Sequence, residues 1–229
     1  MKRLLLIAIF LLPFVACNRQ VQPVESADAP SSQSSASLPT PAVTDDPRPV
    51  LVSFGDSLTA GYGADPDRSY PDYLQKELDS RGYRYRVVNE GVSGNTTKDG
   101  LSRIDEVISL HPAVVIVAFG GNDGLRGVQP QEMQANLDSI VDTLQKAHAR
   151  VVLAGITLPP NYGAAYIQRF DGVYPSIAKK YHTPLLPFML ENVWNVPGDM
   201  QLDGIHATAA GNAQVARNLL PVIEPLLTK

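Results

Sequence analysis

Short apolar runs alternate with amphipathic stretches along most of the chain, starting near residue 50. The runs have the length and composition of β-strands. Between them, apolar residues recur at intervals of three and four, as Met133, Leu137, Ile140 and Leu144 do, which is typical of a helix with one buried face. The pattern predicts strands at 50–54, 85–89, 113–119, 150–155 and 184–187, and helices at 70–80, 100–110, 130–149, 166–181 and 209–227.

This order of elements predicts the fold class. The third run, AVVIVAF, is apolar without alternation, as expected of a strand covered by helices on both faces of a parallel sheet. Strict alternation of strands and helices indicates βαβ units. We therefore expect an α/β protein with a flavodoxin-like, three-layer α/β/α fold and a five-stranded parallel sheet. No internal repeat or second domain is apparent, and ligands should bind beyond the C-terminal ends of the strands.

The first 17 residues, MKRLLLIAIFLLPFVAC, have the layout of a secretory signal: positive charges, an apolar core and a small residue near its end. The core is short for a stable membrane-spanning helix. The ending V-A-C resembles a bacterial lipobox, in which Cys17 would be lipidated. Phe14 departs from the aliphatic residue usual there, and the alternative is an ordinary signal cleaved elsewhere, for instance after Ala29. By the rules of such lipoproteins, Asn18 favours the outer membrane.

Residues 18–49 are rich in Ser and Pro and have almost no large apolar side chains. Such a segment cannot bury enough surface to offset its ordering entropy, so we expect a disordered tether. With about 32 residues, its mean reach would be on the order of 30 Å. The sequence thus predicts a signal peptide at 1–17, a tether at 18–49 and a folded domain at 50–229, exported to the periplasmic side and anchored to a membrane.

Composition excludes several function classes. A net charge of -4 provides no basic field for nucleic acid. The single cysteine, Cys17, lies in the leader, so no intramolecular disulfide can form, and no Cys-His spacing suggests a metal site. Residues 61–66 do not match G-x-G-x-x-G, and the chain has no Walker A string. No cofactor is implied.

The unusual polar residues lie directly after predicted strands. The first apolar run stops at Gly55 and is followed by Asp56 and Ser57. Because the C-terminal ends of parallel strands meet at one edge of the sheet, the loops after the strands should come together. These loops contain residues 55–57, 91–96 and 120–123, together with 203–206 just before the last helix.

Ser57 has the partners that a serine nucleophile needs. A serine hydroxyl requires a base within hydrogen-bond reach, and the base must itself be oriented. Asp203 and His206 are three residues apart, so the carboxylate can accept from Nδ1–H and leave Nε2 facing Ser57. Position 59 is Thr, so this is not the G-x-S-x-G nucleophile elbow. Donors for an oxyanion could be the backbone N–H of Ser57, that of Gly94, and the side-chain amide of Asn122.

Four sequence blocks resemble those of the SGNH (GDSL) hydrolase family. They are G-D-S-L at 55–58, S-G-N-T at 93–96, G-G-N-D at 120–123 and D-G-I-H at 203–206. The longer strings GDSLTAGYG, GGNDGLRG and DGIHATAAGNA are similar to the bacterial thioesterase I, lysophospholipase L1 and arylesterase branch. The resemblance covers residues 50–227. It implies that Ser57 is the nucleophile, His206 the base and Asp203 its orienting group, with the Ser57 amide, Gly94 and Asn122 forming the oxyanion hole.

Each block alone has an ordinary structural explanation. Asp56 or Asp203 could cap a turn, the glycines at 120 and 121 could serve a tight turn, and Ser93, Asp123 and Arg126 could shape loops. Four blocks in the right order at strand ends favour the catalytic interpretation. The remaining histidines, His111, His148 and His182, have no triad-like neighbour in sequence.

The loop ITLPPNYGAA, residues 156–165, could form an apolar wall for an acyl chain, through Leu158, Pro159 and Tyr162 together with Leu125. The alternative is a rigid connection packed on the domain. The resemblance implies action on acyl thioesters, lysophospholipids, and aryl or short-chain esters. Export argues against acyl-CoA, so we favour a lysophospholipid or another carboxylic ester. Two alternatives remain: an O-acetylesterase of an envelope glycan, and a non-catalytic surface-binding lipoprotein.

Overall fold

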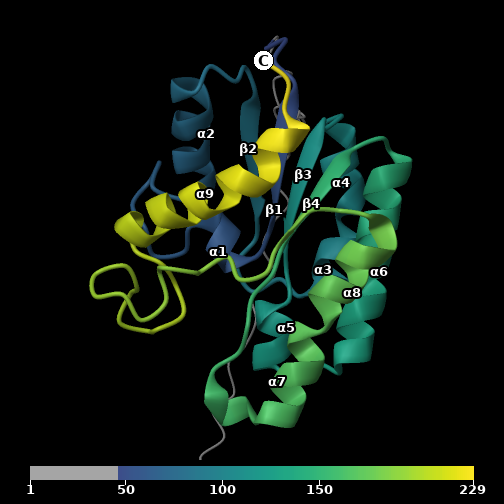
Figure 1. Cartoon of the computed structure of the whole chain (residues 1–229), viewed down its shortest axis with the longest axis vertical. Coiled ribbons are helices and arrows are strands. Elements are labelled where there is room, and N and C mark those ends of the chain that lie inside the picture. The colour runs from purple at the N-terminus through teal and green to yellow at the C-terminus, as the bar shows by residue number, and fades with distance from the viewer. Residues whose placement is uncertain (1–45) are drawn as a thin grey trace, which may run out of the picture. The chain divides into compact units, whose positions relative to one another are not determined.

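Five parallel strands form one sheet in the order β2-β1-β3-β4-β5 (Figure 1). The computed structural model describes residues 46–229. The predicted signal, lipobox and most of the tether lie outside these residues. The interior strand β1 pairs on both sides, with Leu51 opposite Val87 and Val114. The predicted flavodoxin-like parallel sheet is confirmed. Its strands are β1 (Val50–Gly55), β2 (Arg86–Gly91), β3 (Val114–Ala118), β4 (Arg150–Ala154) and β5 (Leu185–Leu186).

Each central strand is buried on both faces, which explains the missing alternation in its sequence. In β3 all five residues are buried. Val115 and Val117 belong to one apolar core, whereas Val114 and Ile116 belong to the core on the other face. Because successive side chains of a strand point to opposite faces, a strand between two cores must be apolar at every position.

Helices cover both faces of the sheet (Figure 1). One core is closed by α2 (Tyr70–Ser80) and α9 (Ala209–Ile223). The other is closed by α4 (Ile104–Ser109), α6 (Pro130–Lys146) and α8 (Val173–Tyr181). No helix within residues 46–229 is long and apolar enough to cross a membrane. The remaining helices are α1 (Ser57–Ala60), α3 (Thr97–Ser102), α5 (Gly121–Leu125) and α7 (Ala164–Asp171), with 3-10 turns η1 (Pro160–Tyr162) and η2 (Glu224–Leu226).

Two stretches predicted as single helices are each divided in two. The stretch 100–110 breaks at Arg103, where α3 ends and α4 begins. The guanidinium of Arg103 donates to the carbonyls of Gly55 and Glu90 at 3.0 and 2.9 Å, so this residue is committed to the sheet edge. The stretch 166–181 breaks at Gly172, a residue with low helix propensity.

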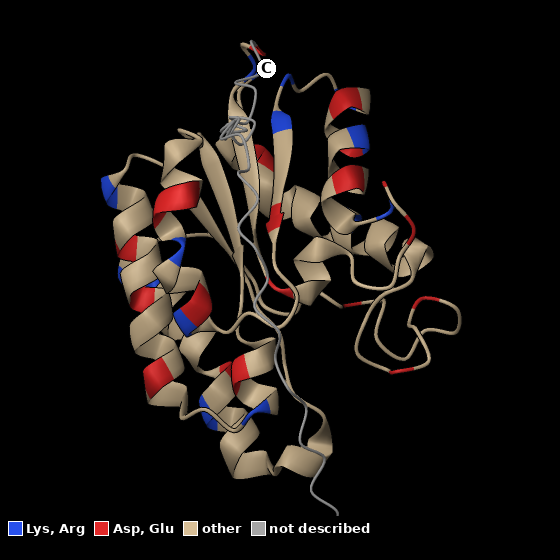
Figure 2. Ribbon diagram, turned by 180° about the vertical axis from the view of Figure 1, so that it is seen from behind, with Lys and Arg blue, Asp and Glu red and all other residues tan. Residues whose placement is uncertain are grey.

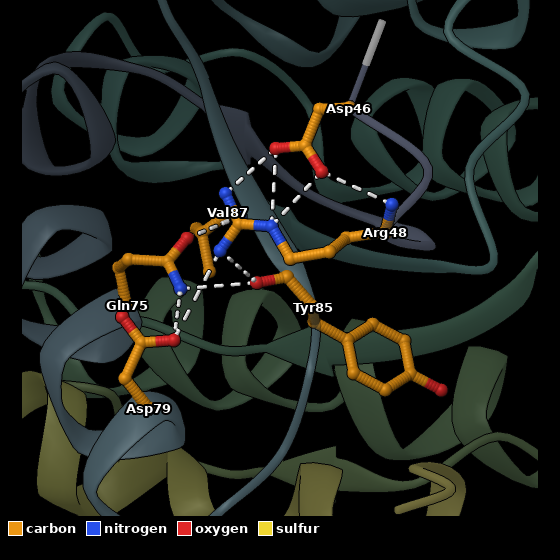
Figure 3. Close-up of polar contacts among 6 residues, drawn as sticks. All are labelled: Asp46, Arg48, Gln75, Asp79, Tyr85 and Val87. Atoms are coloured by element: carbon orange, nitrogen blue, oxygen red, sulfur yellow. Dashed lines mark hydrogen bonds and ion pairs between the residues drawn. The ribbon is translucent and has the colours of Figure 1, made fainter.

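The start of the folded unit is fastened beside β2 (Figure 3). Arg48 pairs with Asp46 at 2.7 Å and donates to the carbonyl of Tyr85 at 3.4 Å. Gln75 donates to the same carbonyl at 3.0 Å and accepts from the N–H of Val87 at 2.8 Å. Because β2 is an edge strand, the backbone groups on its outer side have no neighbouring strand, and the Gln75 side chain supplies hydrogen bonds to two of them. Among the described residues, Arg48 thus already contacts the domain.

Candidate active site

Ser57 is held at the C-terminal end of β1 by one turn of helix. The strand ends at Gly55, and the side chain of Asp56 accepts from the N–H of Leu58 at 3.0 Å as the N-cap of α1. A side chain at Gly55 would overlap Thr59, so the sharp change from strand to helix requires glycine. The turn ends at Gly61, in the left-handed region with φ of 76°. Ser57 thus stands at the first position of a short, well-capped turn.

His206 and Asp203 lie in a row with Ser57. The imidazole Nε2 is 2.9 Å from Ser57 Oγ, and Nδ1 is 2.6 Å from Asp203 Oδ2. With the proton on Nδ1, the carboxylate accepts it and Nε2 is left as an acceptor for the serine hydroxyl. The three predicted side chains are therefore brought together from loops almost 150 residues apart, with a sequence separation of 149 between Ser57 and His206.

Asp203 is kept ionised by its hydrogen bonds. Its Oδ1 accepts from the backbone N–H groups of Ile205 and His206 at 2.9 and 3.0 Å. Partial burial would raise the pKa of Asp203, but the bonds from the His206 ring and from these two N–H groups lower it to about 2. The carboxylate is thus both fixed in direction and charged at neutral pH.

Three potential hydrogen-bond donors for an oxyanion belong to Ser57 itself and to two residues that line the same cavity, Gly94 and Asn122. The amide of Asn122 donates to the carbonyl of Asn95 at 3.0 Å and lies 3.4 Å from Asp56 Oδ2. Gly94 has a φ of 85°, a conformation that favours glycine, and Arg126 donates to its carbonyl at 2.9 Å. Ser57 is the first residue of α1, so its N–H has no partner within the helix.

Asp56 is a buried carboxylate beneath the site. Its side chain is 4% exposed, and burial raises its pKa from 3.8 to about 6, against the lowering effect of the Leu58 N–H. Oδ1 caps α1, while Oδ2 faces the Asn122 amide. This one side chain therefore contacts both the turn that holds Ser57 and the amide of Asn122.

Asp123, next to Asn122, joins two of the site loops from below. It is buried, and it accepts from the backbone N–H of Thr97 at 2.9 Å and from the Thr97 hydroxyl at 2.5 Å. Asn136 of α6 donates to the same hydroxyl at 3.1 Å. Burial raises the pKa of Asp123. From the sequence, Asp123 could merely shape a loop. In the structure it is buried, and its hydrogen bonds join α5 to the start of α3.

An apolar cavity opens beside Ser57 and has a volume of about 290 Å³. Ser57, Gly94, Asn122 and His206 all line it. Three residues predicted for the acyl wall, Leu125, Leu158 and Pro159, line it as well. The sequence did not indicate the rest of the wall, which follows β5 and could have been found by extending the strand-end rule to that strand. These further apolar residues are Phe188, Leu190 and Trp194. Ile156, the first residue of the predicted loop 156–165, also lines the cavity.

Tyr162 corrects the predicted wall. The cavity lining within residues 46–229 does not include it. Pro159 and Pro160 lead the chain into the turn η1, and Tyr162 at its end packs partly buried against the core. Its hydroxyl donates to the carbonyl of Leu125 at 3.3 Å. Tyr162 therefore supports a wall residue and does not face the cavity.

The three other histidines end helices. His111, His148 and His182 have φ values of 48°, 65° and 50°, in the left-handed region, after α4, α6 and α8 respectively. Histidine is among the non-glycine residues enriched in that region. All three therefore occupy structural positions at the ends of helices.

A hydroxyl, an imidazole and a carboxylate in one row, next to donors and an apolar cavity, are the arrangement by which serine hydrolases act. On a parallel sheet, at the C-terminal ends of the strands, they define a serine carboxylic ester hydrolase. The chain belongs to the GDSL-like Lipase/Acylhydrolase family, also called the SGNH (GDSL) hydrolases, whose model matches residues 53–214. The predicted resemblance is confirmed.

Similar proteins carry names of this class. The esterase TesA of Pseudomonas aeruginosa is 44% identical over 179 residues, which cover 78% of this chain and 89% of that protein. The thioesterase 1/protease 1/lysophospholipase L1 of Escherichia coli K12 is 39% identical, covering 78% of this chain and 85% of that protein. The crystal structure of TesA matches with a TM-score of 0.75 at 44% identity, covering 78% of this chain and 99% of the solved chain. The solved TesA chain therefore corresponds almost entirely to the domain described here.

Proposed function

We propose that the protein hydrolyses carboxylic esters through an acyl-enzyme on Ser57. The observation that carries this proposal is the row of Ser57, His206 and Asp203, with contacts of 2.9 and 2.6 Å. His206 Nε2 takes the hydroxyl proton while Ser57 Oγ attacks the ester carbonyl carbon. The same imidazole then protonates the leaving alcohol. Water, activated in the same way, hydrolyses the acyl-enzyme and restores Ser57.

The negative charge on the carbonyl oxygen needs donors already in place. We assign these to the N–H groups of Ser57 and Gly94 and to the Asn122 amide. An amide has two N–H bonds, and in the structure Asn122 donates to the Asn95 carbonyl at 3.0 Å and to Asp56 Oδ2 at 3.4 Å. We infer that the second, longer bond gives way to the substrate oxygen. Removing one such donor typically costs about 3 kcal/mol of transition-state stabilisation.

The substrate is a lysophospholipid or an aryl, short-chain or medium-chain ester. The wall of Leu125, Leu158, Pro159 and Trp194 supports an acyl chain, and a volume of about 290 Å³ is at the small end for ligand sites. The names of TesA and of thioesterase 1/lysophospholipase L1 agree with this choice, and they make thioesters a further substrate to test.

The test is hydrolysis of p-nitrophenyl acetate, butyrate and octanoate by residues 46–229, with Ser57→Ala as the matched control. We expect turnover that rises from acetate to butyrate or octanoate and is lost in the variant. Unchanged turnover in Ser57→Ala would exclude the mechanism. Activity on acetate alone would favour the O-acetylesterase, and no turnover by either protein would favour a binding function.

We infer from the sequence that the domain acts outside the cytoplasm and is held at a membrane by a lipid attached to Cys17. The apolar leader, the V-A-C ending and the Ser- and Pro-rich residues 18–49 support this inference. Cys17→Ser should move the protein from the membrane fraction to the soluble fraction or leave an uncleaved precursor. A wild-type chain that is already soluble in the periplasm would contradict it.

A further inference from the structure

The large apolar side chains that are exposed in residues 46–229 gather around the cavity. All of them lie on loops that carry or adjoin the site, and we call them the mouth rim: Tyr62, Val92, Val196, Leu202 and Ile205. Tyr62 and Ile205 also line the cavity. Val92 directly precedes Ser93 and Gly94 in the lining, and Val196 follows Trp194 of its wall. The apolar wall of the cavity thus continues onto the outer surface.

The most exposed rim residue is presented by a rigid turn. Leu202 is fully exposed, although it lies next to Asp203. Its turn is closed by a bridge between Met200 and Ala207, and by the bond from the Gln201 N–H to the His206 carbonyl at 2.8 Å. The turn that carries Asp203 and His206 therefore also carries the exposed Leu202. A single exposed leucine would be ordinary, but Leu202 adds to a group of exposed apolar side chains on the loops of one site, and such a group indicates a binding surface.

The charges near the rim are mainly acidic, although Arg126, which donates to the Gly94 carbonyl at 2.9 Å, lies on the Val92 side. The loop that leads into α9 contains acidic residues, including Asp199 and Asp203, and no Lys or Arg (Figure 2). The loop that follows Tyr62 contains Asp65 and Asp67 against one Arg68. An anionic surface would be repelled by this arrangement, whereas a surface without net charge would not.

We propose that the mouth rim docks on a zwitterionic phospholipid surface and delivers single lipid molecules to Ser57. This inference rests on the proposed function to the extent that it assigns a lipid ester to the cavity. Docking lowers the rim side chains into the boundary between headgroups and acyl chains, as interfacial proteins do. A lipid then passes from an apolar layer to an apolar cavity along Tyr62 and Ile205, without crossing water.

The test is binding of residues 46–229 to phosphatidylcholine vesicles, measured by co-sedimentation in the Ser57→Ala background so that no lipid is consumed. Leu202→Ser and Val92→Ser together should weaken binding about tenfold or more, because each removes an apolar side chain from the interface. Leu202→Ile, the matched control, should bind as the parent does. Vesicles containing phosphatidylglycerol should bind the parent less well than pure phosphatidylcholine.

Activity with Ser57 intact separates docking from chemistry. The same double variant should hydrolyse dissolved p-nitrophenyl butyrate at the parent rate and lose activity only on vesicle-borne lysophosphatidylcholine. Equal vesicle binding by parent and double variant would overturn the proposal, as would stronger binding to the anionic vesicles. A rim-dependent dimer in sedimentation, with no vesicle binding, would assign the rim to a second copy of the chain. Vesicle binding without ester hydrolysis would instead contradict the proposed function alone.

Discussion

The ring of Tyr62 lies against the imidazole of His206, with the ring centroids 4.6 Å apart and the planes inclined by 41°. Gln201 holds this contact in place, since its amide donates to the carbonyl of Tyr62 at 2.7 Å and to that of Ala207 at 2.9 Å. The turn after Ser57 and the turn with His206 are therefore tied together by the ring contact and by the Gln201 amide. In the proposed reaction the imidazole becomes a cation, which an aromatic face attracts.

Replacing Tyr62 should lower kcat through this contact. We expect Tyr62→Phe to keep activity, because the ring is retained. Tyr62→Leu should lose about 0.5–2 kcal/mol of stabilisation of the imidazolium, or roughly 2- to 30-fold in kcat. The measurement is steady-state hydrolysis of p-nitrophenyl butyrate. A role in substrate binding alone would instead raise KM in both variants and leave kcat unchanged.

Asp203→Asn should nearly abolish turnover without unfolding the protein. The Asn Oδ1 can still accept from the N–H groups of Ile205 and His206, but an N–H now faces Nδ1. That donor favours the tautomer with the proton on Nε2, which cannot accept the proton of Ser57. We expect a loss in kcat of about 10³- to 10⁴-fold in a variant that remains folded, with a lower Tm at neutral pH because the lowered pKa of Asp203 stabilises the parent there. A loss below tenfold would show that Asp203 does not set the tautomer.

Asp56 should make the protein less stable as pH rises. Its pKa is about 6 in the fold against 3.8 as the unperturbed value, so the native state binds more protons between these two pH values. Stability therefore falls as pH rises through that window, by roughly 2–3 kcal/mol. Asp56→Asn removes this contribution and keeps an oxygen to cap Leu58.

Urea unfolding at pH 4, 5, 6 and 7 measures the effect as the difference between parent and variant. The difference is needed because the contribution of Asp203 to stability changes with pH in the opposite direction. Its lowered pKa contributes stability that is present above 3.8 and is lost as pH falls toward 2. If the two stability curves run parallel between pH 4 and 7, Asp56 is not the source.

Asp123→Ala should destabilise the domain and weaken catalysis together. The change leaves the buried N–H and hydroxyl of Thr97 without their acceptor, at a cost of about 2–4 kcal/mol. It also removes the hydrogen bonds that hold α5 to the start of α3, and α5 carries Asn122. The matched control is Asp138→Ala, which removes a surface ion pair with Lys180 worth about 1 kcal/mol or less. Denaturant midpoints and kcat report the two effects, and equal losses in the two variants would contradict the role of Asp123.

The sequence predicts the parts of this fold that depend on local pattern. Val114 to Ala118 reads as a doubly covered strand because each of its side chains meets a core. The position of Ser57 follows in the same way, since a parallel sheet collects the loops after its strands at one edge. Such inferences need only periodicity and the rule for where ligands bind.

The parts that the sequence does not predict depend on contacts between distant residues. Arg103 interrupts a helical pattern because the carbonyls of Gly55 and Glu90 lie within its reach, which no local pattern reveals. Tyr162 has the apolar ring expected of a wall residue. The turn that starts at the two prolines instead directs its hydroxyl to the carbonyl of Leu125. The burial of Asp56 likewise arises only after α1 has packed under the site.

Both ends of the described chain meet at Tyr85, at the start of β2. Arg48 donates to its carbonyl, and the N–H of Thr228 donates to its hydroxyl at 3.3 Å. Ser57 and the cavity lie at the opposite ends of the strands. A solid support, a label or a fusion partner joined at residue 46 or at residue 229 would thus leave the mouth unobstructed. Since the ends are neighbours, a short linker could also close them, and the chain could be opened anew elsewhere as a circular permutant.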